Sequence, residues 1–374
     1  VFARYMQFFC FAGNVSLGLS SNLKTILADF KAFKPTFILA VPRIFEKIYN
    51  AASQKAGAGF KGRVFADATQ TAYDWSHAQQ SGGSIPLALN AKHALYNKLV
   101  YSSIMEVFGG HVEYAVSGGA PLDSSIAHFF NGVGLPLLEG YGMTETCAPS
   151  SVNPTEGYKI GTIGLPLQGV IMGVDEEGEL CIKSPAVCAG YHKNPDVTKQ
   201  QIVDGWLHTG DLGSIDDDGF VSIVGRKKDL IITAGGKNVS PCEMEASIMT
   251  SPVVSQCVMI GDRKPFIAAI ISLDLAETNL WLESKGAEQV ADLDEASKNP
   301  IVRAEVERAV NKANKLASRA ESIRKFEIVP DEFTEENGLV TPSMKARRQA
   351  VVEHYRTLID KVIYVPRKPA AHAE

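Results

Sequence analysis

The spacing of apolar and polar residues predicts alternating helices and strands over the first 150 residues of the chain. Apolar residues at three- and four-residue steps over 23–30 indicate a helix, and the run Thr-Phe-Ile-Leu-Ala-Val at 36–41 indicates a short buried strand. An alanine-rich stretch over 52–105 predicts further helices. Two apolar strands then lead into glycine-rich turns within 112–123 and 135–146. This alternation is typical of an α/β fold with a parallel or mixed sheet covered by helices.

The pattern changes to apolar–polar alternation after residue 155. Residues 161–187 alternate around an Asp-Glu-Glu-Gly turn, which is typical of a β-hairpin. We therefore expect a β-hairpin-rich subdomain at about 155–225, which would complete a large first domain at 1–225.

The last third of the chain predicts a smaller α+β domain at 230–374. It contains an amphipathic helix expected at 300–322, which is too short for a coiled coil, and a final helix expected at 346–363. The basic turn at 226–229 is the expected boundary between the two domains.

Composition narrows the class of protein without identifying it. Of the 374 residues, 45% are hydrophobic and 21% are charged, which is the balance of a globular enzyme. The net charge of −5 gives no basic footprint for nucleic acid. No apolar run approaches the roughly 18 residues of a membrane span. The six cysteines and eight histidines form no Cys-x-x-Cys or His-Glu-x-x-His motif. We therefore expect reduced thiols in the cytoplasm, without a zinc site or redox pair.

Two glycine-rich loops are candidates for phosphate contact, because glycine lets backbone amides approach an anion closely. They are Ser-Gly-Gly-Ala-Pro-Leu-Asp at 117–123 and Glu-Gly-Tyr-Gly-Met-Thr-Glu-Thr at 139–146. The second contains an aromatic ring for a base (Tyr141), a hydroxyl for a phosphate (Thr144) and a carboxylate for Mg²⁺ (Glu145). The alternative is structural, with a core tyrosine and a helix-terminal glutamate. Local sequence alone leaves both interpretations open.

Two further segments favour a nucleotide site. Asp211 is expected on a tight Thr-Gly-Asp turn, where its carboxylate is suited to accept hydrogen bonds from both hydroxyls of a ribose. Arg226 follows within the basic turn and is expected to reach the same sugar. Near the end, Thr-Pro-Ser-Met-Lys-Ala-Arg-Arg at 341–348 presents Lys345. A lysine in a polar loop is usually only a solvated charge, so by itself Lys345 carries no assignment.

Together these segments resemble the acyl-adenylate-forming enzymes. Six motifs occur in the family's order and spacing, namely Ser-Gly-Gly-Ala-Pro-Leu-Asp, Glu-Gly-Tyr-Gly-Met-Thr-Glu-Thr, the stretch 178–198, Gly-Trp-Leu-His-Thr-Gly-Asp-Leu-Gly, the stretch 225–241, and Thr-Pro-Ser-Met-Lys-Ala-Arg-Arg. The resemblance is greatest to AMP-forming long-chain fatty-acid–CoA ligases, which also have a segment similar to residues 40–49. It covers essentially the whole chain. It implies a large adenylate-forming domain followed by a small mobile C-terminal domain.

The resemblance also implies a role for individual residues. ATP or AMP, Mg²⁺ and coenzyme A would be the ligands, and a long-chain fatty acid the substrate. Adenine would contact the first two loops, at Gly119, Ala120, Pro121, Glu139, Gly140, Tyr141 and Gly142. The reacting phosphate and the metal would contact Thr144 and Glu145, and the ribose would contact Asp211 and Arg226. Coenzyme A would pass Gly235, Gly236 and Lys237, Lys228 would be the hinge, and Lys345 would bridge the carboxylate and the α-phosphate.

The chain departs from the family pattern at its front. The family's Thr-Ser-Gly-Thr-Thr-Gly phosphate loop is absent, and its expected place lies upstream of Val1. We therefore expect a first domain that is incomplete at its front, with weak ATP binding and an exposed apolar face.

Two alternatives to the acyl-CoA ligase stay open at this stage. One is a fatty-acyl-AMP ligase that delivers to a carrier protein, although the compact segment 228–241 lacks the insertion of such ligases. The other is a non-catalytic acyl- or nucleotide-binding protein. The sequence leaves open the acyl chain length, the oligomeric state and the pathway. Peripheral contact with a membrane also stays open, because the expected substrate is a fatty acid.

Overall fold

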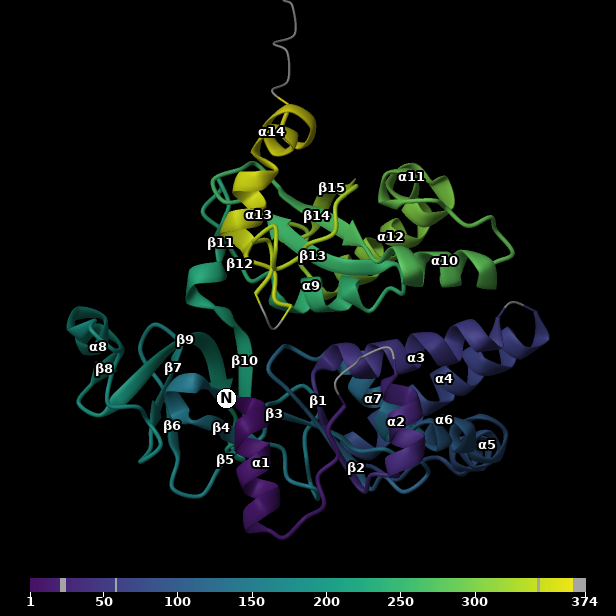
Figure 1. Ribbon diagram of the computed structural model, residues 1–374, viewed down its shortest axis with the longest axis horizontal. Helices are drawn as coiled ribbons and strands as arrows, with labels where there is room; N and C mark the ends of the chain where they lie inside the picture. Colours follow the sequence, from purple (N-terminus) through teal and green to yellow (C-terminus); the bar gives the residue numbers. More distant parts are fainter. Residues whose placement is uncertain (21–24, 58, 342–343, 366–374) are drawn as a thin grey trace, which may run out of the picture. The chain divides into compact units, whose positions relative to one another are not determined.

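The computed structural model describes residues 1–20, 25–57, 59–341 and 344–365 (Figure 1). Leu23 of the first expected helix, and Pro342 and Ser343 beside Lys345, lie outside the described residues. The chain forms two compact units, Val1–Lys227 and Lys228–Glu374. The division falls inside the basic turn that the sequence analysis proposes as a boundary.

The first unit contains the expected mixed sheet, with five strands in the order β1-β2-β3-β4-β5 (Figure 1). The first three strands run parallel, β4 runs antiparallel to β3, and β5 runs antiparallel to β4. The strands are β1 Phe37–Ala40, β2 Tyr114–Gly118, β3 Leu137–Met143, β4 Ala148–Val152 and β5 Leu165–Pro166. The helices of this part are α1 Phe2–Ala12, α2 Ile26–Phe33, α3 Pro42–Ala56, α4 Phe60–Gln80, α5 Leu87–Tyr96, α6 Ser102–Val107 and α7 Ser124–Val133, with a π-helical turn at Asn97–Tyr101.

Small residues in the alanine-rich stretch allow α4 and α7 to pack closely. Ala68 and Ala72 on α4 are fully buried. Gly132 on α7 lies so near α4 that an added Cβ would stand 2.2 Å from the Ala72 carbonyl oxygen. The aromatic rings of Phe45 and Phe130 fill the adjoining core and are also fully buried. Burial of each such ring contributes about 1.5–3 kcal/mol to folding.

Strand β3 corrects one expectation from the sequence. The segment 139–143 was expected to be a loop after the strand, but it continues the strand and pairs with β4. Gly142 makes this pairing possible, because an added Cβ would lie 1.7 Å from the Ala148 carbonyl oxygen. The ladder shifts register between Tyr141 and Gly142, so the strand contains a bulge at this point.

A Gly142→Ala substitution is expected to destabilise the first unit by about 2 kcal/mol, because the β4 backbone must move away to admit the methyl group. Urea unfolding measures the change in free energy. Gly83→Ala is the matched control, since an added Cβ there meets no atom within 4 Å, and it should change the free energy by less than about 0.5 kcal/mol. Equal effects in the two variants would contradict the close approach of β3 and β4.

A second, antiparallel sheet forms the β-rich part of the first unit. Its strand order is β10-β9-β7-β6, with β8 also paired to β9. The hairpin predicted around Asp-Glu-Glu-Gly is confirmed, because Val174 of β6 pairs with Leu180 of β7 across that turn. The elements are β6 Ile171–Val174, β7 Glu179–Lys183, α8 Pro195–Gln201, β8 Ile202–Val203, β9 Trp206–Ile215 and β10 Val221–Arg226.

The second unit is built on the three-stranded sheet β13-β14-β15, with a separate hairpin β11-β12. Successive residues of the central strand β14 pack on opposite faces, each with its own core cluster. One cluster includes residues of α9 and α12, and the other includes Val351 and Tyr355 near the end of the chain. The strands are β11 Ile231–Ile232, β12 Asn238–Val239, β13 Val254–Ile260, β14 Ile267–Leu273 and β15 Ile323–Val329. The helices are α9 Cys242–Met249, α10 Leu275–Ser284, α11 Leu293–Lys298, α12 Pro300–Ala313, α13 Arg348–His354 and α14 Arg356–Leu358, followed by a π-helical turn at Ile359–Ile363.

Both long helices expected in this unit are shorter than the sequence pattern predicts. Helix α12 ends at Ala313, because the Asn314 side chain exchanges two hydrogen bonds with the Ile323 backbone and turns the chain toward β15. The last helix begins at Arg348 and is interrupted at Tyr355, whose hydroxyl donates to Asp331 at 2.9 Å.

Exposed apolar side chains gather on α1. Phe8, Phe9 and Phe11 are each more than half exposed. Within the described residues, no helix combines the length and apolar character that a bilayer crossing requires.

Candidate active site

Three of the predicted ribose and adenine residues meet in the first unit. The Tyr141 hydroxyl donates to one carboxylate oxygen of Asp211 at 2.6 Å, and Arg226 Nε donates to the other at 2.7 Å. Tyr141 comes from β3, whereas Asp211 and Arg226 come from β9 and β10. The cluster therefore joins the mixed sheet to the antiparallel sheet, through residues up to 85 positions apart in the sequence.

The position of Asp211 depends on a local distortion of β9. The tight turn predicted at Thr-Gly-Asp is not found, because these residues lie inside the continuous strand β9. The ladder with β7 shifts register here, and Gly210 takes a left-handed conformation with φ of 74°. Thr209 Oγ1 donates to the Leu180 carbonyl and accepts from the Asp211 amide. The bulge thus fixes the buried Asp211 carboxylate opposite Arg226, its direct partner on β10.

Burial and the neighbouring Asp211 carboxylate raise the pKa of Tyr141 well above its usual range. The Tyr141 hydroxyl therefore stays protonated and donates to Asp211 at every physiological pH. A carboxylate has about four lone-pair directions, so Asp211 can accept further hydrogen bonds while it holds both partners.

The first glycine loop lies beside these residues at the carboxyl end of β2. Gly119 takes φ of 82°, and Gly119, Ala120 and Pro121 are all exposed. The register of β2 and β3 pairs Gly118 with Gly140, so the loop begins beside the Tyr141 segment of β3, at the carboxyl end of the parallel strand β2. This edge of a parallel sheet is the usual place for ligand binding in α/β folds.

Glu139 connects the two loops. Its carboxyl interacts with the Leu122 backbone amide and lies near Asp123, which caps α7 through the Ser125 amide. Burial of the Glu139 carboxyl raises its pKa from 4.5 to about 8, and Asp123 adds to the shift. At neutral pH the folded chain therefore holds Glu139 largely protonated.

A Glu139→Gln variant is expected to be more stable than the parent at pH 8, by on the order of 2 kcal/mol, since water offsets part of the desolvation of this half-buried side chain. Between pH 4.5 and about 8 the folded parent binds more protons than the unfolded chain. Its stability therefore falls as the pH rises through that window, and the advantage of the variant should vanish below pH 4.5. Urea unfolding across this range measures the difference. The exposed Glu156→Gln control should show no such trend, and a pH-independent difference for Glu139→Gln would contradict the raised pKa.

Thr144 and Glu145 follow β3 in a short 3₁₀ turn. Thr144 is exposed, and Glu145 is half-buried. The Tyr191 hydroxyl donates to Glu145 Oε1 at 3.0 Å, an orienting contact that sequence reasoning missed because 46 residues separate the pair. A single oriented carboxylate fits Mg²⁺, which is usually held by one or two carboxylates together with substrate phosphates and water.

The remaining predicted residues lie in the second unit. Gly235 and Gly236 form the exposed tip between β11 and β12, and Gly236 takes φ of 75°. Lys237 pairs with Glu321 at 3.2 Å. Lys228 is exposed in the 3₁₀ turn at Lys227–Asp229, where the first unit ends and the second begins.

Lys345 is carried on a short antiparallel turn. Val340 and Ala346 form an isolated bridge, and the Thr341 amide donates to the Lys345 carbonyl at 2.9 Å. The Lys345 amide donates in return to Thr341 Oγ1 at 3.1 Å. Gln256 of β13 holds the Met344 carbonyl at 3.0 Å. The Lys345 side chain is thus exposed on a turn whose backbone is fixed by its own unit.

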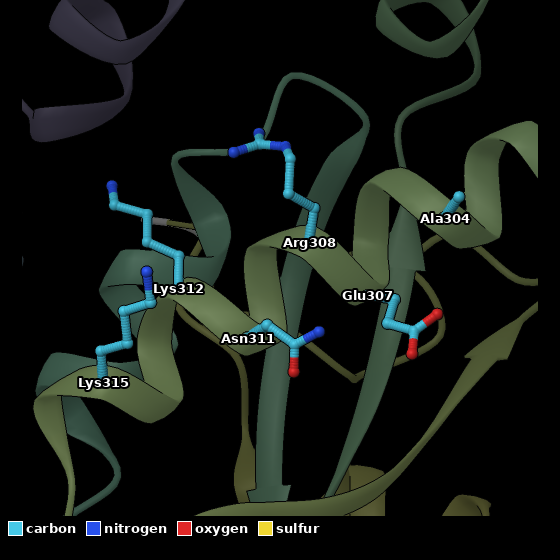
Figure 2. Close-up of a pocket in the computed structure, with 6 residues that line it drawn as sticks. All are labelled: Ala304, Glu307, Arg308, Asn311, Lys312 and Lys315. Carbon is cyan, nitrogen blue, oxygen red and sulfur yellow. The ribbon is translucent and has the colours of Figure 1, made fainter.

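The second unit also has an open hollow of about 510 Å³ along α12 and the turn that follows it (Figure 2). Arg308 on its rim donates two hydrogen bonds to Glu305. None of the predicted site residues lines this hollow, which is formed by Ala304, Glu307, Arg308, Asn311, Lys312 and Lys315.

The cluster in the first unit can hold a sugar and an aromatic base. It offers a buried carboxylate for hydroxyl groups, an arginine beside it, and a tyrosine next to a glycine loop. Together with a mixed sheet, a β-rich subdomain and a separate small α+β unit, this arrangement has the features of the adenylate-forming fold.

Comparison with known families supports this class. The model described as "AMP-binding enzyme" matches residues 1–192, and the model described as "AMP-binding enzyme C-terminal domain" matches residues 228–365. The chain belongs to the AMP-binding enzyme family, as its sequence motifs predict.

The chain is similar in sequence to proteins named as long-chain-fatty-acid–CoA ligases. The chain is 43% identical over 362 residues to the long-chain-fatty-acid–CoA ligase FadD15 of Mycobacterium bovis, which covers 97% of this chain and 60% of that protein. It is 31% identical to the long-chain-fatty-acid–CoA ligase ACSBG2 of Gallus gallus, over 94% of this chain and 49% of that protein. The chain therefore spans about half to 60% of the length of these relatives.

A solved structure confirms the predicted fold. The adenylation domain of a carboxylate reductase from Mycobacterium chelonae matches with a TM-score of 0.65 at 23% identity. The match covers 92% of this chain and 49% of that chain.

Proposed function

We propose that the chain contributes to the ATP-dependent activation of long-chain fatty acids to acyl-CoA. In the first step a fatty-acid carboxylate oxygen attacks the α-phosphorus of ATP. The bond from the α-phosphorus to the bridging oxygen breaks, pyrophosphate leaves, and an acyl-adenylate remains. In the second step the coenzyme A thiol attacks the acyl carbon, AMP leaves, and the thiol proton passes to solvent. The products are acyl-CoA, AMP and pyrophosphate.

The observation that carries this proposal is the joining of Tyr141, Asp211 and Arg226 across the two sheets of the first unit. Asp211 would accept the ribose hydroxyls, Arg226 would hold Asp211 in place, and the Tyr141 ring would stack on adenine. Gly119, Ala120 and Pro121 would border the base, together with Glu139, Gly140 and Gly142. The names of the related ligases from M. bovis and G. gallus support a long-chain fatty acid as the substrate.

Charge placement explains the remaining roles. Two anions react in the first step, so positive charge near the α-phosphate lowers the barrier. Mg²⁺ would supply part of that charge at Glu145, and Lys345 would supply the rest. Thr144 would donate its hydroxyl to the phosphate.

The two steps need different surroundings, which favours movement of the second unit about Lys228. In one arrangement Lys345 would reach the α-phosphate. In the other, Gly235, Gly236 and Lys237 would border the pantetheine arm of coenzyme A, where the absence of side chains at the two glycines permits close approach. We place this activity in the cytoplasm, because all six cysteines are free thiols.

Two reactions test the proposal. One supplies palmitate, ATP, Mg²⁺ and coenzyme A, and the other supplies palmitoyl-AMP and coenzyme A. Palmitoyl-CoA formed from the adenylate supports the ligase. If a folded chain transfers the acyl group of palmitoyl-AMP to a carrier protein supplied in place of coenzyme A, but not to coenzyme A itself, the fatty-acyl-AMP ligase replaces the acyl-CoA ligase as the proposal. A folded chain that binds AMP but catalyses neither reaction would overturn the enzymatic proposal and leave a binding protein.

A further inference from the structure

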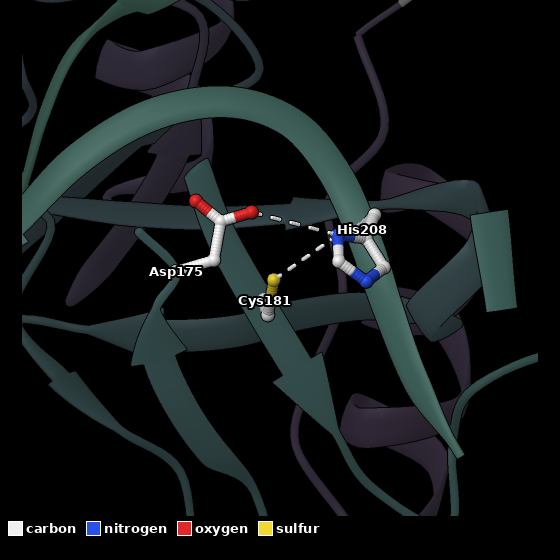
Figure 3. A group of neighbouring side chains, drawn as sticks. All are labelled: Asp175, Cys181 and His208. Atoms are coloured by element: carbon white, nitrogen blue, oxygen red, sulfur yellow. Dashed lines mark hydrogen bonds and ion pairs between the residues drawn. The ribbon is translucent and has the colours of Figure 1, made fainter. Parts of the chain in front are cut away.

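A group of potential metal ligands lies on the β-rich sheet, among residues that the proposed reaction does not use. Asp175, Cys181 and His208 each offer one atom, and these atoms all lie within 4.8 Å of one another (Figure 3). His208 Nδ1 stands 3.4 Å from Cys181 Sγ and 3.8 Å from an Asp175 carboxylate oxygen. Cys181 and His208 face each other directly in the ladder of β7 and β9.

The two separations from His208 Nδ1 are close to the spacing of ligands around zinc. With bonds of about 2.3 Å to sulfur and 2.0–2.1 Å to nitrogen or oxygen, ligands at tetrahedral angles lie roughly 3.3–3.6 Å apart. The distances from His208 Nδ1 therefore need to change by only a few tenths of an ångström. Backbone geometry supports the arrangement, because the strand register itself places the cysteine opposite the histidine.

The Asp175 carboxylate is oriented before any ion arrives. Its Oδ1 atom accepts from the backbone amides of Glu177 and Glu179 at 2.9 and 2.8 Å. The Oδ2 atom is the one that faces His208. Cys181 is buried, whereas the side chains of Asp175 and His208 are 28% and 29% exposed, so an ion can enter from solvent on their side.

Glu179 is a possible fourth ligand, and it has competing partners. Its Oε2 atom lies 3.8 Å from His208 Nδ1 and 3.3 Å from Lys227 Nζ. Its Oε1 atom accepts from the Gly210 amide at 2.7 Å. Glu179 is therefore already engaged, and water is the simpler occupant of the fourth position, as in three-ligand zinc sites.

We propose that Asp175, Cys181 and His208 form a zinc-binding site on strands β7 and β9, distinct from the magnesium position at Glu145. A thiolate and an imidazole are soft and borderline ligands, which select zinc over magnesium and calcium. Formation of the zinc–sulfur bond displaces the Cys181 thiol proton, which passes to the buffer. The site does not depend on the proposed ligase activity.

The experiment is a zinc titration of the chelator-treated chain, without a histidine tag, against a competing indicator. We expect one tight equivalent of zinc and proton release on binding. Cys181→Ser and His208→Gln should each weaken binding by at least about 100-fold, since even loss of an outer contact commonly costs 10- to 100-fold. Cys188→Ser and His192→Gln are the matched controls from the same unit, and should bind as the parent does.

Cobalt provides a second readout that a merely hydrogen-bonded cluster would not give. Thiolate-to-cobalt charge-transfer absorption is expected in the parent and in Cys188→Ser, and is expected to be absent in Cys181→Ser. Asp175→Asn keeps the side-chain shape and should weaken zinc binding while circular dichroism confirms the fold. Zinc binding that is equal in the parent and the folded Asp175→Asn and Cys181→Ser variants, or no tight binding by the parent, would overturn the proposal.

Discussion

A Lys345→Ala variant is expected to form palmitoyl-AMP about 1000-fold more slowly than the parent chain, while it transfers the acyl group from supplied palmitoyl-AMP to coenzyme A at nearly the parental rate. The magnitude is that of removing one well-placed donor from a transition state that gathers negative charge. Release of pyrophosphate measures the first step, and formation of palmitoyl-CoA measures the second.

The structure gives a physical reason to expect this separation of the two steps. The turn that carries Lys345 is held by Thr341 and by Gln256, which bond to backbone atoms of the turn. Truncation of the Lys345 side chain leaves these backbone contacts in place. The variant should therefore keep its fold and lose the positive charge that the side chain carries.

Lys298→Ala is the matched control for this experiment. Lys298 is an exposed lysine of the same unit, and its Nζ atom pairs with Asp294 on its own helix at 2.6 Å. Both steps should stay at the parental rate in this control. An equal loss of both steps in the Lys345→Ala variant would contradict a role restricted to adenylate formation.

An Asp211→Asn variant is expected to bind AMP about 100-fold more weakly than the parent, which corresponds to about 2.7 kcal/mol. Hydrogen bonds to a charged acceptor contribute about 1.5–3 kcal/mol, and the buried carboxylate would accept from the ribose hydroxyls. The amide also gives Tyr141 and Arg226 a weaker partner, so the ring and the guanidinium lose part of their orientation. Isothermal titration calorimetry with AMP measures the change.

Asp217→Asn provides a control of the same chemistry at an exposed position, and should leave AMP affinity unchanged. Circular dichroism and urea unfolding separate loss of binding from loss of folding. Parental AMP affinity in a folded Asp211→Asn chain would contradict the assignment of Asp211 to the ribose.

The sequence determined the family and the order of the elements. The glycine loops, the Thr-Gly-Asp segment and the Lys345 segment are local runs, and their residue types and spacing are visible without coordinates. The hairpin around Asp-Glu-Glu-Gly was likewise predictable, because a turn flanked by alternating residues is a short-range signal. The ligand-binding, catalytic and hinge roles predicted for all of the site residues, from Gly119 to Lys345, stay predictions.

The ends of helices and strands could be predicted less well from the sequence, because contacts between residues that are distant in the sequence determine them. The amphipathic pattern continues past Ala313, yet Asn314 bonds the Ile323 backbone and ends α12. In the same way β3 extends through Gly142 only because β4 packs against it.

The chemical groups of the chain, and the family that they indicate, can be identified from the sequence alone. Which of those groups meet depends on the tertiary structure. It brought Tyr141 to Asp211, Tyr191 to Glu145, and Asp175 to Cys181 and His208, although no sequence motif connects these pairs. These contacts are not visible in the sequence because strand register and the bulge at Gly210 set the positions of the side chains. Strand register depends in turn on the packing of the whole unit, which brings distant strands together.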